Sequence, residues 1–441
     1  MKNILFAFLI ILGIQQPIFG QQPLLLKVDS LFNLAQANSK MLDASRYKIN
    51  MAEKATEIEK QKTNLPNIDA AFSYAYLSNG HVWDNGFNYE NTVKMPHTSL
   101  DLSVEASYLV FDGNASKNRI AKAGLEEQIA QLNFDKDKED IQFLLLAKYL
   151  DLAALYNQEN VVKENISLAE KRISNIKKLI EQGMLTHNDQ VRSELLLTEL
   201  QEKLSEIRNN ANIVNHELVT ITGLPKETII KTDSVMLSEE LQAESAEAYQ
   251  SGFENRLPEL KAANIKSQIA EKQEAVVKSG RLPKVSLFAG DALSRPFLYS
   301  IPPQDIYLHL FQAGVKVQYD IASLYKSKNL VQQAEMEKTL SQKNEAVLAE
   351  KAEIAIHAAY VKLEDAKEKY NSQKESYRLA KDNYRVVEQK YLNKFAVITD
   401  MVDASNALLS AQINVNNARI GIMYQYYQLM KTSGRWDEVN H

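Results

Sequence analysis

The sequence has no cysteine and little net charge, and both absences narrow what it can do. Without cysteine there can be no disulfide bond, no thiolate metal site and no lipid-carrying amino-terminal cysteine. A formal net charge of only -5 favours neither a nucleic-acid binder nor an acidic tail. The common hydrolase, zinc-protease and phosphate-loop motifs are also missing, and the residues nearest to chemistry (His187, His216 and His357) are scattered along expected helices. We therefore predict no enzyme activity, no metal, no cofactor and no nucleic-acid partner.

The amino terminus carries the one strongly apolar run, from Ile4 to Ile14, after Lys2 and before Pro17 and Gly20. A membrane-spanning helix needs about 20 apolar residues, so this run is too short for an anchor. We interpret residues 1–20 as a cleaved secretory signal.

The rest of the chain contains a duplication. The triplet Ser-Lys-Asn at 116–118 recurs at 327–329, an offset of 211 residues. The same offset carries Asp189 onto Asp400 without a gap. A fixed repeat of this kind determines architecture before any local assignment. The predicted organisation is a first repeat at 21–222, an inter-repeat segment at 223–254, a second repeat at 255–434 and a tail at 435–441.

Each repeat contains long stretches with the hydrophobic spacing of coiled-coil helices. From Leu197 to Ile221 the apolar residues alternate steps of three and four, and the seam continues with smaller side chains at the positions 211 residues later. We predict helices at 113–183 and 186–222 in the first repeat and at 322–392 and 397–432 in the second. A shorter helix precedes the strands of each repeat, at 30–62 and 255–281.

Four other segments alternate with the period of two that is typical of strands. They form one hairpin in each repeat, at 67–111 and 284–321, joined by polar loops at 78–98 and 291–307. In the segment from Leu100 to Phe111, apolar residues on one face oppose Asp, Ser and Glu on the other. Apolar-out, polar-in alternation over about ten residues is the pattern of transmembrane β-strands.

Four strands are too few to close a barrel, because single-chain barrels begin at about eight strands. Several copies must therefore share one barrel, and the periodicity alone permits two or three. The helix 113–183 would be about 105 Å long at 1.5 Å per residue. The helices 186–222 and 30–62 together have nearly the same number of residues, so stacking them end to end would give a helical wall of uniform height.

Three motifs resemble those of the TolC-type outer-membrane efflux proteins, both in themselves and in their order and spacing along the chain. The resemblance covers essentially the whole mature chain. Arg-Leu-Pro-Glu-Leu at 256–260 resembles the opening of that family's second repeat, and Val-Phe-Asp-Gly at 110–113 is similar to its step from strand into helix. Residues 182–189 resemble its helix-tip motif, in which a glycine precedes an aspartate by six residues.

The resemblance implies an α+β membrane protein. Four transmembrane β-strands per chain would form a shared 12-stranded barrel in a homotrimer, continued by a long α-helical coiled-coil barrel. The protein would lie in the outer membrane of a Gram-negative bacterium, in contact with its lipid, with a long periplasmic extension. It would be the exit duct of a tripartite efflux or type I secretion system, opened by a periplasmic adaptor protein and an inner-membrane pump.

The resemblance also assigns a periplasmic gate. Asp400 and Asp403 occupy the positions of the family's acidic rings, and Tyr391 that of a gate tyrosine. A ring of like charges at a narrow mouth attracts cations. The alternative is that Asp400 caps its helix and Asp403 is solvated. Lys394 stands where the family has a tip glycine and Ala396 where it has an arginine, which leaves the latching contacts open.

The turns between long and short helices are the expected adaptor-docking tips, because an exposed apolar tip often marks a contact site. The alternative is a packed hairpin turn. The tip residues are Gly183, Met184, Leu185, Thr186, Asp189, Lys394, Phe395, Ala396 and Val397.

A periplasmic coiled-coil scaffold or adaptor protein is the competing interpretation. It would explain the heptads but not four amphipathic strands at duplicated positions.

Overall fold

The computed structural model describes residues 24–233 and 241–440, so the predicted signal segment 1–20 lies outside it. The chain divides into two compact units. The first contains residues up to Lys40, Lys138–Ala248 and His357–His441, and the second contains Met41–Asp137 and Tyr249–Ile356. No helix of the described residues is apolar over a length that could cross a membrane.

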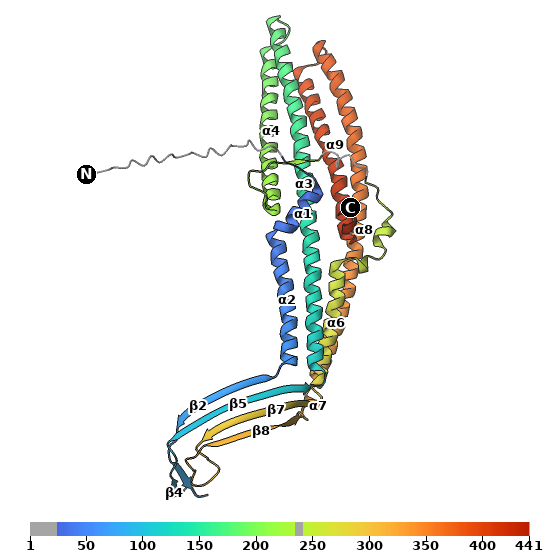
Figure 1. Cartoon of the computed structure of the whole chain (residues 1–441). Helices are drawn as coiled ribbons and strands as arrows, with labels where there is room; N and C mark the ends of the chain where they lie inside the picture. Colours follow the sequence, from blue (N-terminus) through green and yellow to red (C-terminus); the bar gives the residue numbers. More distant parts are fainter. Residues whose placement is uncertain (1–23, 234–240, 441) are drawn as a thin grey trace, which may run out of the picture. The chain divides into compact units, whose positions relative to one another are not determined.

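The second unit contains a four-stranded antiparallel sheet with the order β2-β5-β7-β8 (Figure 1). Its strands are β2 (Asn67–Tyr76), β5 (Thr98–Phe111), β7 (Lys284–Arg295) and β8 (Leu308–Gln318). Each repeat contributes one hairpin, and β5 pairs with β7 to join the two repeats. Strands β2 and β8 are therefore the two edges of the sheet.

The register of the sheet separates apolar from polar side chains. Phe72 pairs with Leu102, which pairs with Leu293, whereas Ser73 pairs with Asp101 on the other face. Directly paired residues point to the same side of a sheet, so the period of two in the sequence becomes one apolar and one polar face.

The helices of the second unit follow the order of the strands. They are α2 (Lys40–Asn64), the first part of α3 (Ala115–Glu181), α6 (Pro258–Ser279), the short α7 (Ser323–Lys326) and the first part of α8 (Lys328–Leu392). Helices α2, α3, α6 and α8 lie side by side in that order in Figure 1.

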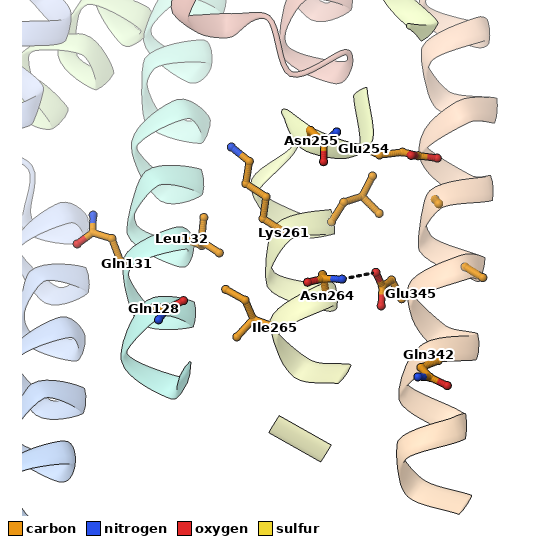
Figure 2. A pocket seen from close by; sticks show the side chains of 13 residues that line it. Gln128, Gln131, Leu132, Glu254, Asn255, Lys261, Asn264, Ile265, Gln342 and Glu345 are labelled. Atoms are coloured by element: carbon orange, nitrogen blue, oxygen red, sulfur yellow. Dashed lines mark hydrogen bonds between the residues drawn. The ribbon is translucent and has the colours of Figure 1, made fainter. Parts of the chain in front are cut away.

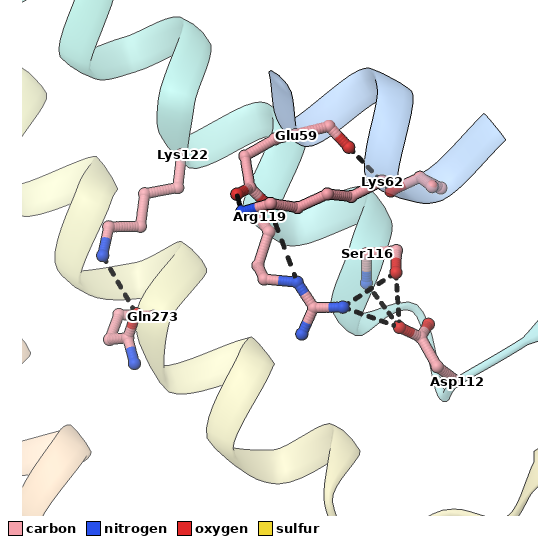
Figure 3. Close-up of polar contacts among 8 residues, drawn as sticks. Glu59, Lys62, Asp112, Ser116, Arg119, Lys122 and Gln273 are labelled. Atoms are coloured by element: carbon pink, nitrogen blue, oxygen red, sulfur yellow. Dashed lines mark hydrogen bonds and ion pairs between the residues drawn. The ribbon is translucent and has the colours of Figure 1, made fainter. Parts of the chain in front are cut away.

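The step from β5 into α3 is fixed by a buried carboxylate (Figure 3). Asp112 accepts hydrogen bonds from the backbone N–H of Ser116 at 2.8 Å, from its hydroxyl at 2.6 Å and from Nη2 of Arg119 at 3.1 Å. Gly113 has φ of +69°, and a Cβ there would come within 2.9 Å of Leu282. The Asp-Gly pair at this step is therefore required by a helix cap and a left-handed backbone together.

The first unit contains the helices that end at the tips. They are the remainders of α3 and α8 together with α1 (Val28–Asn38), α4 (His187–Thr222) and α9 (Ile398–Thr432). Val162 and Ala169 of α3 pack with Leu200 and Ile207 of α4 and Leu409 of α9 in one buried cluster. Leu200 and Ile207 are positions of the predicted coiled-coil seam, whereas Leu409 is one residue beyond the seam position expected at 408.

The prediction of one helix at 30–62 is wrong, because the chain breaks at Ser39 between α1 and α2. Ser39 is extended, with ψ of 119°. Beside it, the side-chain Nδ2 of Asn38 donates to the carbonyl of Thr222 at 2.9 Å, at the end of α4. Asn and Ser compete for backbone hydrogen bonds in this way, which lowers their helix propensity. The predicted helix 322–392 is likewise interrupted for one residue at Ser327.

The loop predicted at 78–98 contains a further hairpin, β3 (Gly80–Trp83) with β4 (Tyr89–Val93). The loop predicted at 291–307 starts too early, because β7 continues to Arg295 and β8 starts at Leu308. The loop was predicted to start at Asp291 because this residue interrupts the apolar alternation of the sequence. In the structure Asp291 lies on the apolar face of the sheet, where its Oδ1 is 2.6 Å from Nε2 of His309. At the other end, the hairpin predicted to reach 321 ends at Gln318.

The inter-repeat segment 223–254 contains a short strand, β6 (Ile230–Thr232), which pairs in parallel with β1 (Leu24–Leu26). It also contains the short helix α5 (Ala246–Gln250). The tail contains a short 3-10 helix, η3 (Trp436–Asn440). Trp436 is fully buried and donates from Nε1 to Oε1 of Gln142 at 2.8 Å.

Candidate functional site

The first tip is a glycine-terminated helix end. After α3, the N–H of Met184 donates to the carbonyl of Leu179 and the N–H of Gly183 to that of Ile180, both at 2.8 Å. Gly183 has φ of +71°. This pair of bonds is a Schellman motif, which satisfies carbonyls that the helix end would otherwise leave free.

The second tip repeats this motif with lysine in place of glycine. The N–H of Phe395 donates to the carbonyl of Lys390 at 2.7 Å, and that of Lys394 to Tyr391 at 3.0 Å. Lys394 has φ of +66°. The departure noted in the sequence therefore changes the side chain and adds backbone strain, but it preserves the hydrogen bonds of the turn.

An aspartate caps the helix after each tip. Asp189 Oδ2 accepts from the N–H of Thr186 at 2.8 Å and from its hydroxyl at 2.6 Å. Asp400 Oδ2 accepts from the N–H of Val397 at 3.1 Å, and valine has no hydroxyl to add a second bond. In this conformation Asp400 makes the helix-capping contact that is the alternative to its predicted role in the gate.

Below the turns, the two helical hairpins share an apolar cluster. Ile176, Tyr391, Ile398 and Met401 are buried there, and Leu185 and Ala396 pack against them. Phe395 and Met184, in contrast, are 83% and 42% exposed. The residues predicted as adaptor-docking tips thus divide into packed and exposed ones.

Tyr391 lies in this cluster and does not line an open surface. It is only 6% exposed, and its hydroxyl has no hydrogen-bond partner among the described residues. Burial, helped by the negative charge of Asp189 and opposed by the positive charge of Arg172, raises the pKa of Tyr391 to about 12. The phenol therefore stays neutral at physiological pH.

Sequence reasoning missed a polar contact between the two hairpins. Arg172 of α3 donates from Nη2 to the hydroxyl of Tyr384 of α8 at 3.0 Å, and Tyr384 donates to Oε1 of Glu388 at 3.1 Å. Burial raises the pKa of Tyr384. Nη1 of Arg172 is buried without a hydrogen-bond partner in the described chain. The only sign of this contact in the sequence was the arginine itself, on a helix with coiled-coil spacing. No local sequence pattern identifies its partner on a distant helix.

Asp400 and Asp403 lie one turn apart on α9, and both are exposed. Residues three apart on a helix share a face. Together they line a shallow groove of about 520 Å³ whose other residues come from the ends of α8 and α9 and the turn between them: Asn383, Val387, Lys390, Phe395, Ala396, Ala404 and Ala407. The structure therefore brings the two acidic residues together and leaves Tyr391 apart from them.

A larger hollow of about 770 Å³ lies in the second unit beside α3, α6 and α8 (Figure 2). Its polar groups bond to each other, since Glu345 accepts from Nδ2 of Asn264 at 3.0 Å and from the hydroxyl of Ser267 at 2.9 Å. Within residues 24–233 and 241–440, no three His, Asp or Glu side chains are placed to hold a metal. The hollow therefore offers apolar surface beside polar groups that are already hydrogen-bonded to one another.

No protein-family model and no curated protein matches this sequence. Solved structures match it over nearly the whole chain. The outer membrane protein VceC of Vibrio cholerae has a TM-score of 0.73 at 14% identity, over 92% of this chain and 96% of its own. A membrane protein from Pseudomonas aeruginosa has 0.75 at 13%, over 93% and 91%. The CmeC outer membrane channel of Campylobacter jejuni has 0.71 at 14%, over 93% and 86%. These similarities confirm that the single chain has the TolC-type fold that the sequence motifs implied.

Proposed function

We propose that this chain, which has the fold of TolC-type outer membrane channels, is one subunit of such a channel in a Gram-negative outer membrane. Three copies would combine their four-stranded sheets into one twelve-stranded barrel. Their helices would form a periplasmic conduit that an adaptor and an inner-membrane pump open at its tips. The protein would conduct solutes passively, and the pump would select them.

The observation that carries this proposal is the incomplete sheet. Strand β2 is exposed along its whole length, and both β2 and β8 lack a neighbour on one side among the described strands. Unpaired edges of this length are liable to pair with another strand. Edge-to-edge pairing of several copies would satisfy both edges and close the sheet.

The two faces of the sheet fit the two environments of such a barrel. The apolar face includes Phe72, Leu102 and Val315, which suits lipid, and the polar face includes Asp101 and Lys316, which suits a water-filled lumen. A barrel that opened the polar face to lipid would put unpaired charges in hydrocarbon, at a cost of several kcal/mol per group, whereas Asp291 and His309 on the apolar face pair with each other. We therefore assign the apolar face to the outside.

A pair of substitutions tests this assignment. Val315→Arg puts a charge on the lipid side, where arginine costs about 2–4 kcal/mol in each copy, whereas Lys316→Arg keeps the charge on the lumen side. We expect the first variant to lose the membrane-extracted oligomer and the second to retain it. The readouts are detergent-dependent extraction, oligomer size and conductance in planar bilayers.

The competing interpretation, a periplasmic coiled-coil scaffold, gives the opposite result. A scaffold would be recovered without detergent as a water-soluble protein, would conduct no ions and would tolerate Val315→Arg as readily as Lys316→Arg. This outcome would overturn the channel proposal.

At the tips we propose three roles. Asp400 and Asp403 form the acidic ring of the closed mouth, supported by their exposure on one face of α9. Phe395 and Met184 are the apolar contacts for the adaptor, supported by their exposure beyond the packed cluster. Tyr391 acts as a positioning residue inside the cluster, since its ring packs between the hairpins.

A further inference from the structure

The helices of the second unit form a row with two free outer members. Side-chain contacts join α2 to α3 (Arg119 to Glu59), α3 to α6 (Lys122 to Gln273) and α6 to α8. The row α2, α3, α6, α8 repeats the order of the strands β2, β5, β7, β8 (Figure 1). Any ring that joins β8 of one copy to β2 of the next therefore also brings α8 of one copy to α2 of the next.

Both outer helices have an exposed apolar stripe with a spacing of seven residues. On α2 it consists of Ala44, Met51 and Ile58, and Met51 is 71% exposed. On α8 it consists of Leu340, Val347 and Ile354, which are 59%, 47% and 62% exposed. A stripe repeating every seven residues is the signature of a helix that packs along another helix.

The two stripes lie at matching heights. At the end nearer the sheet, Glu59 of α2 lies beside Arg119, which is less than one turn from Lys122. Lys122 bonds to Gln273, and the adjacent Glu274 pairs with Lys338 of α8. Following these contacts across the row puts Ile58 at the level of Leu340.

The same alignment holds at the far end of α2. Ser45 bonds to Asp137, and the adjacent Lys136 lies 3.8 Å from Glu259 of α6. Further along α6, Asn264 bonds to Glu345 of α8. Since α6 and α8 are antiparallel, Glu259 is level with a residue about five positions beyond Glu345. The residues Ala44 and Ile354 are thus within about one turn of each other in height.

The positions between the apolar residues are complementary too. In the antiparallel register that pairs Met51 with Val347, Lys48 faces Glu350 and the small Ala55 faces Lys343. Lys48 and Glu350 are exposed, and neither makes an ion pair within the described part of the chain. In this register the facing positions on α2 and on α8 both follow alternating steps of three and four residues. Each position on one helix therefore has a partner on the other, as an antiparallel coiled coil requires.

We propose that α2 of one copy and α8 of the next form an antiparallel seam in which Ile58 packs on Leu340, Met51 on Val347 and Ala44 on Ile354, with Lys48 paired to Glu350. This inference rests on the proposed oligomeric channel and specifies which surfaces join its subunits in the helical part. The occupant of both stripes is therefore a second copy of this chain.

Cysteine crosslinking tests the seam directly, because the chain has no cysteine of its own. The double variant Met51→Cys with Val347→Cys should form disulfides between subunits under mild oxidation and run as covalent oligomers on denaturing gels. The matched control, Met51→Cys with Ile354→Cys, shifts one partner by seven residues, or about 10 Å along the helix. It should crosslink at least tenfold less.

Charge reversal provides a second test. Lys48→Glu alone should reduce the yield of assembled oligomer, and Lys48→Glu with Glu350→Lys should restore it. If both cysteine pairs crosslink equally, or the reversed pair restores nothing, the proposed register is wrong.

The wild-type protein separates this failure from that of the channel proposal. A detergent-extracted oligomer that conducts ions but gives no Met51 to Val347 crosslink would overturn the seam alone. A wild-type chain that is monomeric and soluble without detergent would overturn both proposals. Crosslinks within one subunit would also contradict the seam, and would appear as a shifted monomer rather than a covalent oligomer.

Discussion

The two helical tips have the same backbone but differ in almost every side chain. Each ends in a Schellman turn and starts its next helix with a capping aspartate three residues on. The first tip uses Gly183 and a threonine cap, whereas the second uses a strained Lys394 and a valine. The second tip also has the more exposed apolar residue, Phe395. At the first tip, glycine and threonine suit the left-handed turn and the helix cap. At the second tip, lysine and valine suit them less well, but a large apolar side chain is exposed. We infer that function acts mainly on the second tip.

The largest expected difference between the tips is in adaptor binding. Phe395→Asp removes an apolar side chain from the second tip, and burying a phenylalanine is worth about 1.5–3 kcal/mol, which corresponds to a loss of affinity of roughly ten- to a hundredfold. Met184→Asp at the first tip should cost less, because Met184 is half as exposed. Pull-down with a periplasmic adaptor that binds the wild-type protein measures both. Equal losses at the two tips would contradict the assignment of function to the second.

Ion selectivity should also depend on the second tip. Asp400→Ala with Asp403→Ala removes the proposed acidic ring, so single-channel conductance should rise and the preference for cations should fall several-fold. Asp189→Ala is the matched control, since it removes a cap without removing ring charge. Because Asp400 also caps α9, the double variant should lose about 1 kcal/mol of helix stability. If conductance and selectivity stay at the wild-type values, Asp400 is only a cap.

Two tyrosines of α8 allow the contact between the tips to be tested. Tyr384→Phe removes a hydroxyl that bonds to Arg172 and Glu388, and should lower the free energy of unfolding by about 1 kcal/mol. Tyr391→Phe removes a buried hydroxyl that has no partner in the described chain, so stability should be unchanged or slightly higher. Denaturant unfolding of the purified protein compares them. A larger loss for Tyr391→Phe would mean that its hydroxyl has a partner in the assembled channel.

The sequence predicted the parts of this fold that repeat. The offset that carries Asp189 onto Asp400 predicted two equivalent turns, and the seam positions Leu200 and Ile207 of α4 lie in a buried cluster, because local periodicity determines which helix face is apolar. It could not predict contacts between distant segments. Trp436 looked like part of a featureless tail but is buried against Gln142, and β6 found its partner in β1 about two hundred residues away. No local pattern contains such pairings, and the break at Ser39 depends on one of them through its neighbour Asn38.

The smallest expected effect comes from the left-handed backbone conformation that the two tips share. Lys394→Gly relieves a left-handed lysine and should stabilise the second tip by about 0.5–1 kcal/mol, while Gly183→Lys should destabilise the first by a similar amount. A Cβ at Gly183 would meet no atom within 4 Å, so its cost is conformational and not steric. If both changes behave as expected and Lys394→Gly nevertheless weakens adaptor binding, the lysine is retained for its charge. If adaptor binding is unaffected, the strained backbone at Lys394 has no part in binding. The functional difference between the tips then lies in Phe395 and the two aspartates alone.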